Sequence, residues 1–171
     1  LDNKGTFNIS NIELNSQFVE LKANGFYFDE VRNENSPTQL TLFAVSDVTE
    51  QSDMNVNILS SLEKSRVGFL VNNGSNFSDA KRQAQKEILA IFEIEKDEIA
   101  NSELLDISKA GEDNAILLAI SVIMQGYLSV PDLSELLANI STDIREDGFL
   151  DNEALGTILI NNAMALKVLE I

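Results

Sequence analysis

Ala115 to Leu128, AILLAISVIMQGYL, is the longest stretch of the chain in which almost every residue is apolar or small. A helix that is apolar on all sides has to be buried on all sides. We therefore expect this stretch to be the central helix of a helical domain, with the other helices packed around it. It carries no side chain suited to catalysis, so it bears on the fold and not on a reaction.

Helical periodicity also marks the segments on either side of this stretch, from about Asn55 onward. In the segment after Asn76, which can cap a helix, the apolar residues form one face, and we expect Lys81, Arg82, Gln85 and Lys86 to face water. The apolar positions of the other expected helices recur at the same spacing: Leu59, Leu62, Phe69 and Leu70; Leu133, Leu136, Leu137, Ile140 and Ile144; Leu155, Ile158, Leu159, Ala163 and Leu166. A short helix is expected around Glu103 to Asp106.

The first part of the chain has the alternating pattern of strands. Thr6 and Asn8 alternate with Phe7 and Ile9, and further β-branched and aromatic runs predict about four strands joined by hairpin-like turns. The expected strands cover residues 6–14, 18–21, 25–31 and 40–45. The sequence therefore predicts an α+β fold, in which a short antiparallel sheet (residues 1–48, a partial β-sandwich) precedes a bundle of about five or six helices around a buried central helix (residues 49–171).

Composition excludes several classes of function. The 171 residues contain no Cys and no His, which removes disulfides, zinc thiolates and the commonest general base. Twelve basic against 28 acidic residues give a net charge of −16, which argues against nucleic acid or an anionic membrane as partner. No apolar run reaches the length of about 18 residues that a bilayer requires. Because the chain starts with Leu1, we expect any signal peptide or lipid-anchoring cysteine to lie upstream.

Seven stretches, in order along nearly the whole chain, resemble an uncharacterised family of secreted or lipid-anchored surface proteins from Bacteroidetes-type bacteria. These are GFYFDEV (25–31), LTLFAVSDV (40–48), NVNILSSLEKSRV (55–67), FSDAKRQAQKEILAIF (77–92), EDNAILLAISVIMQG (112–126), SELLANISTDI (134–144) and DGFLDN (147–152). The NKGTFNI run (3–9) before GFYF also resembles the end of a carboxypeptidase-regulatory or transthyretin-like β-sandwich. The resemblance implies an extracellular or outer-membrane location, a non-catalytic accessory role and further strands upstream; it supplies no catalytic residues to transfer.

The best candidate for a chemical site is the segment from Asp143 to Asp151, between two expected helices. Compared with a calcium-binding loop, it supplies carboxylates at the first, fifth and ninth places (Asp143, Asp147, Asp151) and Gly148 at the sixth. Arg145 at the third place and Ala154 at the twelfth depart from the pattern. The alternative interpretation is structural: Gly148 ends one helix in a left-handed conformation and Asp151 caps the next.

Other polar residues have structural interpretations first. Asp29 and Glu30 flank an aromatic cluster, Phe26 to Phe28, but neighbouring strand residues point to opposite faces, so the two acids are not expected to form a catalytic pair. Arg66 is expected to be an ion-paired structural residue, and Asn162 to satisfy a backbone group. Ser60, Ser61 and Lys64 have the S-x-x-K spacing without its companion motifs.

These observations favour a non-enzymatic surface or secreted accessory domain of a bacterial envelope protein, acting in adhesion, assembly or binding of an external polymer. Its expected partners are an envelope polysaccharide or another surface protein. The first alternative is a carboxylate-based glycan hydrolase, which requires two carboxylates about 5–10 Å apart in a cleft. The second is a structural spacer tied by calcium, with no other cofactor expected.

Overall fold

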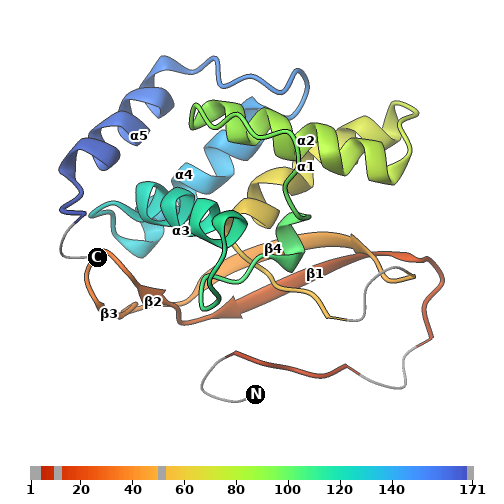
Figure 1. Ribbon diagram of the computed structural model, residues 1–171, viewed down its shortest axis with the longest axis horizontal. Coiled ribbons are helices and arrows are strands. Elements are labelled where there is room, and N and C mark those ends of the chain that lie inside the picture. The colour runs from red at the N-terminus through yellow and green to blue at the C-terminus, as the bar shows by residue number, and fades with distance from the viewer. Residues whose placement is uncertain (1–4, 10–12, 50–52, 169–171) are drawn as a thin grey trace.

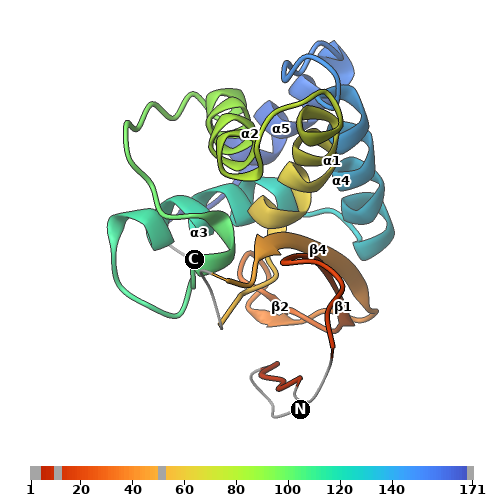
Figure 2. The same ribbon diagram turned by 90° about the vertical axis from the view of Figure 1, so that its right-hand side faces the viewer.

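The computed structural model describes residues 5–9, 13–49 and 53–168. It confirms the α+β class, with strands first and five α-helices after them (Figure 1). The strands are β1 (Phe18–Gly25), β2 (Phe28–Asp29), β3 (Glu34–Asn35) and β4 (Leu40–Asp47); the helices are α1 (Ile58–Asn72), α2 (Phe77–Ile91), α3 (Glu112–Gln125), α4 (Val130–Asp143) and α5 (Glu153–Ala165), with a 3-10 turn η1 (Ser102–Leu104). The helices lie together on one side of the strands (Figure 2).

The main sheet is an antiparallel ribbon of β1 and β4, in register from Phe18 opposite Asp47 to Gly25 opposite Leu40. Between them, β2 and β3 form a separate short hairpin. The predicted strand over 6–14 does not form in its described residues, and residues 10–12 lie outside the described part. The side chains of Phe7 and Ile9 are 46% and 56% exposed, so the apolar side of this segment is not buried against the rest of the protein. Alternation alone is therefore not enough to form a strand.

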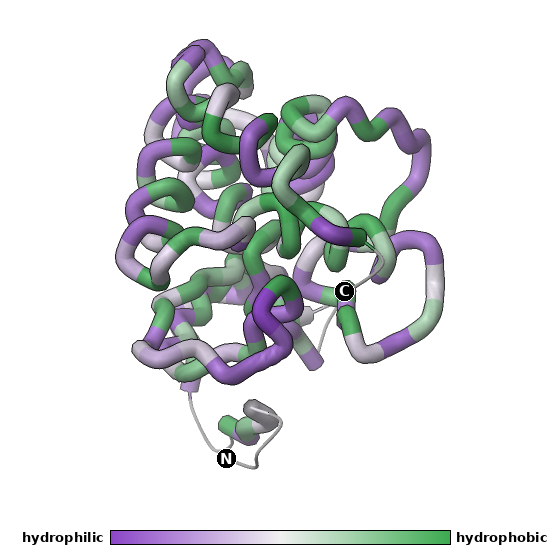
Figure 3. The backbone as a smooth tube through the Cα atoms, turned by 90° about the vertical axis from the view of Figure 1, so that its left-hand side faces the viewer, coloured by the Kyte–Doolittle hydropathy of each residue, from purple (hydrophilic) through white to green (hydrophobic). Residues whose placement is uncertain are grey.

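Helix α1 is the element around which the molecule packs. It contacts α2, α3, α4, β4 and η1, and its Leu59 and Leu62 are fully buried. Leu40 of β4 belongs to the same core cluster as the buried residues of α1, α3, α4 and α5, so the ribbon and the helices share one core. The hydrophobic stretches accordingly gather at the centre of the molecule (Figure 3).

The α3 helix corresponds to the stretch that decides the fold, and its buried residues include Leu117, Ile120 and Met124. It is not enclosed on every side, because Ala115 and Ala119 are exposed. Small apolar residues tolerate exposure, so an apolar run with alanine at this spacing still has one open flank.

The helix starts follow local capping chemistry. The Asn57 side chain accepts a bond from the Ser60 amide in a capping box, and Asn76 caps α2 as the sequence predicted. Ser129 caps α4, whose second residue is Pro131. In the described residues, no single helix combines the length and apolarity needed to cross a membrane; α3 and α4 meet the criteria only as a pair bent by 113°.

Candidate functional site

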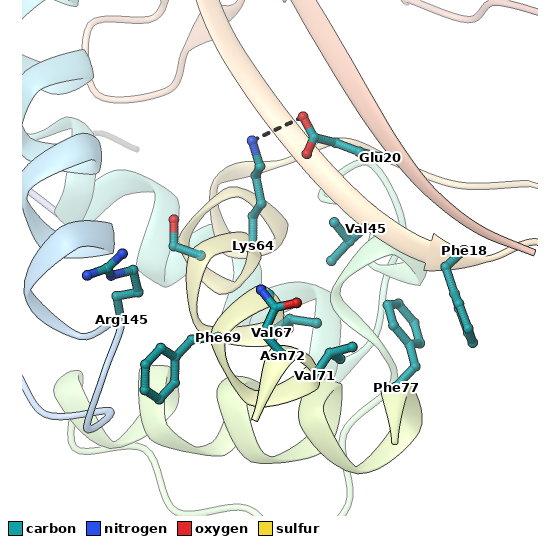
Figure 4. Close-up of a pocket in the computed structure, with 12 residues that line it drawn as sticks. Phe18, Glu20, Val45, Lys64, Val67, Phe69, Val71, Asn72, Phe77 and Arg145 are labelled. Carbon is teal, nitrogen blue, oxygen red and sulfur yellow. Dashed lines mark ion pairs between the residues drawn. The ribbon is translucent and has the colours of Figure 1, made fainter. Parts of the chain in front are cut away.

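An open groove of about 480 Å³ runs between α1 and the face of the ribbon that carries Phe18, Glu20 and Val45 (Figure 4). We call it the α1 groove. Its walls come from both strands of the ribbon, the second half of α1, the start of α2 and the segment after α4. The lining residues are Phe18, Glu20, Val45, Lys64, Ser65, Val67, Gly68, Phe69, Val71, Asn72, Phe77 and Arg145.

The interior of the groove is apolar. Val45 and Val67 line it, and the side-chain-free Gly68 leaves the backbone of α1 open there, with nothing within 4 Å of the place where a Cβ would stand. Phe18 and Phe77 stack beside them, with ring centroids 4.7 Å apart. Phe18 remains 45% exposed, so this aromatic surface is accessible to a partner.

The rim of the groove carries charges that are largely satisfied. Lys64 forms an ion pair of 3.0 Å with Glu20, and its ammonium also lies 4.0 Å from the centre of the Phe43 ring. Arg145 forms an ion pair with the neighbouring Glu146. The groove therefore has an apolar interior and a rim whose two cations come from α1 and from the segment after α4.

A second polar cluster is sealed inside the protein. Lys81 Nζ lies 2.7 Å from Glu63 Oε2 and 2.7 Å from Glu103 Oε2, so one ammonium joins two carboxylates. Glu63 also accepts a hydrogen bond from Ser102 Oγ, and Glu103 accepts one of 3.0 Å from Ser46 Oγ. The three charged side chains, which we call the buried triad, are at most 4% exposed and connect α1, α2 and η1.

The triad is electrostatically frustrated because two carboxylates share one cation. Burial raises the pKa of Glu63 even though Lys81 lies against it. Burial also disfavours the charged ammonium of Lys81, but the two carboxylates outweigh this and raise its pKa above 10.5. The two acids are close enough to resemble a hydrolytic pair, yet with exposures of 0% and 2% they are out of reach of a substrate.

The sequence-based prediction for this part of α2 was wrong. Lys81 and Gln85, expected to face water, are 4% and 5% exposed. Their positions do fit burial, because Lys81, Ala84, Gln85 and Ile88 follow the i, i+3, i+4, i+7 spacing of a single helix face. The polar residue types hid a periodicity that was present, and the partners that permit burial come from distant segments.

In the aromatic hairpin, Asp29 and Glu30 bind different partners. Tyr27 packs against the core, while Phe26 and Phe28 are 65% and 50% exposed. Asp29 forms an ion pair of 3.5 Å with Arg32, whereas Glu30 accepts a hydrogen bond of 2.6 Å from Gln125. Burial, followed by the charges of Asp29 and Glu30, raises the pKa of the Tyr27 hydroxyl.

Two of the three carboxylates of the predicted calcium loop, those of Asp143 and Asp147, accept hydrogen bonds from backbone amides. Asp143 Oδ2 accepts from the amides of Asp151 and Asn152 at 2.9 and 3.2 Å, and Asp147 Oδ1 accepts from the Phe149 amide at 3.0 Å. No group of three or more potential metal ligands occurs among residues 5–9, 13–49 and 53–168. Gly148 is left-handed, with φ of +83°, but Asn152, not the predicted Asp151, caps α5, because its side chain reaches the Ala154 amide.

The calcium prediction can be tested by thermal melting in excess calcium and in chelator. Amide-bound carboxylates offer little to a cation, so we expect the same midpoint in both, within about 1 °C. Asp147→Asn serves as the control, because it keeps the acceptor for the Phe149 amide. A calcium-dependent rise in midpoint that Asp147→Asn abolishes would instead establish the loop as a cation site.

Two structural interpretations from the sequence are confirmed. Arg66 forms a two-pronged pair with Glu87, with distances of 2.7 and 2.9 Å, and donates to the Glu146 carbonyl at 2.6 Å. It thereby joins α1 and α2 to the segment after α4. Asn162 Nδ2 donates to the Ile123 carbonyl at 2.9 Å, which satisfies a backbone group as expected.

Ser60 and Ser61, the serines with the S-x-x-K spacing, serve the sheet edge. Ser60 Oγ donates to the Phe43 carbonyl at 2.8 Å, and Ser61 Oγ accepts from the Phe43 amide at 2.8 Å. Lys64 pairs with Glu20 instead. This arrangement docks the start of α1 on the edge of β4.

No family model, curated protein or solved structure matches the chain. The resemblance to surface proteins therefore stays a prediction, and the functional argument depends on the geometry of the α1 groove. The sequence analysis missed the groove because it forms only where the ribbon meets α1. A glycine inside the helical pattern, Gly68, was its one local signal.

Proposed function

We propose that this chain is a non-enzymatic accessory domain of a bacterial envelope protein, at the cell surface or secreted, that acts in assembly. Its role is to hold an apolar polypeptide segment of another surface protein in the α1 groove. The observation that carries the proposal is an open groove with an apolar interior and two exposed or half-exposed aromatic rings, Phe18 and Phe77, at one place on its wall.

The chemistry of the groove favours a polypeptide over a polysaccharide. A volume of about 480 Å³ is within the usual range for bound segments and small ligands. Sugar rings need several convergent hydrogen-bonding groups, but the interior of the groove is lined by valines and phenylalanines. Aliphatic side chains of a peptide match such an interior, and Gly68 lets a main chain approach α1 closely.

The rim adds a preference for an acidic residue in the bound segment. Lys64 and Arg145 are two of only 12 basic residues in a chain with a net charge of −16. Both rim pairs lie at the surface, with the side chains of Glu20 and Glu146 48% and 64% exposed, so an acidic residue of a bound segment can replace either partner. We therefore expect the partner segment to combine aliphatic residues with a single Asp or Glu.

The alternatives rank lower on geometry. The close carboxylate pair is sealed beneath Lys81, so a glycan hydrolase would need an acid pair elsewhere. The calcium-tied spacer depends on a loop whose aspartates accept amide hydrogens. The accessory role is also what the sequence resemblance implies.

Short capped peptides of alternating leucine and serine with one central aspartate are the probe for this proposal, measured by fluorescence anisotropy. We expect these peptides to bind the unmodified protein and the Gly156→Leu variant with the same affinity. They should bind Gly68→Leu at least about tenfold more weakly, because a leucine at position 68 fills the groove. Both glycines lie inside helices with no atom within 4 Å of an added Cβ, so both variants should fold.

Equal binding to both glycine variants would reject the α1 groove as the site. Peptides with lysine in place of aspartate should bind more weakly, because the rim cations Lys64 and Arg145 then repel the ligand. If soluble cell-wall oligosaccharides bind and the peptides do not, the domain is a polymer-binding module, and the assembly role is refuted.

A further inference from the structure

The outer edge of β1 is open in the part of the chain that the structure describes. Its other edge pairs with β4, and the far edge of β4 is covered by the start of α1 through Ser60 and Ser61. Both views show β1 on the side of the ribbon away from the helices (Figures 1 and 2). An eight-residue strand with an open edge is a template for pairing with another strand.

The backbone groups that face outward from this edge can be identified. The Val48 amide donates to the Gln17 carbonyl at 2.9 Å, so Gln17 points its groups toward the strand that contains Val48. Along a strand, the N–H and C=O groups of successive residues point to alternate sides. The N–H and C=O groups of Glu20, Lys22 and Asn24 therefore point away from β4, toward the open edge. Among the described residues, no hydrogen bond engages these groups.

We propose that β1 pairs antiparallel with β1 of a second copy of this chain, about a two-fold axis at Leu21. The two ribbons then form one continuous sheet in which each copy contributes β4 and β1. The same patch binds itself, as in most symmetric dimers. This inference is independent of what binds in the α1 groove.

The charges on β1 select this register. About Leu21, Glu20 of each copy faces Lys22 of the other, and Val19 faces Ala23, so opposite charges and apolar residues meet. The next allowed registers place Glu20 against Glu20 or Lys22 against Lys22, where like charges repel. A shift by one residue is excluded because it turns every side chain to the other face.

Both faces of the extended sheet stay consistent in this register. Val19, Leu21 and Ala23 are half-buried on the face of the ribbon opposite to Phe18 and Glu20, and pairing continues their apolar surface across the axis. The opposite face carries Phe18 and Glu20 of the α1 groove, so the two grooves lie on the same face of the sheet. At physiological salt, the repulsion between two copies of charge −16 is screened beyond about 8 Å, while opposed charges at the edge remain in contact.

Sedimentation equilibrium of the full chain tests the association itself. One strand pair buries little area, so we expect a weak, concentration-dependent dimer with a Kd between about 1 µM and 1 mM at 0.15 M salt. A monomer at about 1 mM would overturn the proposal.

Charge reversal tests the register. Glu20→Lys and Lys22→Glu each place like charges opposite one another twice, and each should weaken dimerisation about tenfold or more. The double variant Glu20→Lys with Lys22→Glu restores the opposite pairs and should regain the dimer. Lys64→Gln, which removes the contacts of the Lys64 ammonium with Glu20 and Phe43 within one copy, is the matched control and should dimerise as before.

Cysteine cross-linking tests the same geometry without altering charge. The chain contains no Cys, so a single Leu21→Cys variant has one possible disulfide partner, its own symmetry mate at about 4.5 Å between Cα atoms. We expect rapid disulfide dimer formation on mild oxidation. Val19→Cys, whose partner is Ala23, should not cross-link; equal cross-linking of the two variants, or a dimer insensitive to charge reversal, would refute the two-fold axis at Leu21.

Discussion

Replacement of Lys81 by methionine is expected to lower the free energy of unfolding at pH 7 by about 3–5 kcal/mol, because it leaves two buried carboxylates without a counter-ion. Glu63 and Glu103 are each at most 2% exposed, so neither can recover its hydration. Urea unfolding measures the change. Lys86→Met, on the exposed side of the same helix, should stay within about 0.5 kcal/mol of the unmodified protein.

The pH dependence identifies the cause of this loss. Burial holds the folded-state pKa of Glu63 above 4.5, so the stability of its protonated form is present below 4.5 and is lost as pH rises through the folded value. Without Lys81 the folded-state pKa of Glu63 should rise further, because the ammonium no longer opposes the effect of burial. The difference in free energy of unfolding between Lys81→Met and the unmodified protein should therefore be smallest near pH 4.5 and should grow toward neutral pH. A difference that does not depend on pH would mean that the variant loses packing and not a counter-ion.

At alkaline pH the free energy of unfolding of the unmodified protein should likewise fall as pH rises, through Lys81. The pKa of Lys81 is raised by its two carboxylates beyond the opposing effect of burial. Its contribution to stability is thus present below 10.5 and lost as pH rises through the raised pKa. The free energy of unfolding of Lys81→Met should not fall in this way at alkaline pH.

Gly148→Ala is expected to lower the free energy of unfolding by about 2–4 kcal/mol. Gly148 has φ of +83°, and a Cβ there would overlap the Glu87 carboxylate. That carboxylate holds Arg66, which is itself buried, so its displacement also weakens the two-pronged pair that joins three segments. Thermal or urea unfolding gives the magnitude.

Gly74→Ala is the matched control for this substitution. Gly74 also has a positive φ, +98°, but nothing lies within 4 Å of its added Cβ. Gly74→Ala should therefore show the backbone strain alone, about 1–2 kcal/mol. Equal losses at the two glycines would show that the contact with Glu87 contributes nothing beyond backbone conformation.

Local chemistry accounts for the parts of the fold that the sequence predicts well. Asn76 and Ser129 cap their helices through side chains that act within three residues, and the apolar spacing of each helix is visible along the chain. Strands β1 and β4 were predicted in part, over residues 18–21 and 40–45. The alternation at Phe7 and Ile9 gave a wrong prediction of a strand. A strand also needs a neighbouring strand to pair with, and the sequence of a single segment does not show whether it has one.

The candidate sites depend on contacts that no local pattern contains. The buried triad joins residues 63, 81 and 103, which lie far apart in the sequence. Their charges suggest exposure, and only their positions along the helices indicate that they are buried. The α1 groove requires the crossing of the ribbon with α1, and the open edge of β1 becomes apparent only after the sheet order is known. In each case the three-dimensional arrangement of elements, not the residue type, determines the property.

The buried triad also constrains how this protein can diverge through evolution. Loss of Lys81 alone leaves two buried carboxylates without a counter-ion, and loss of either acid alone changes the charge balance of the buried cluster. Homologous chains should therefore keep all three residues or replace them together with uncharged ones. We expect positions 63, 81 and 103 to covary as a unit, even though none of them can touch a partner molecule.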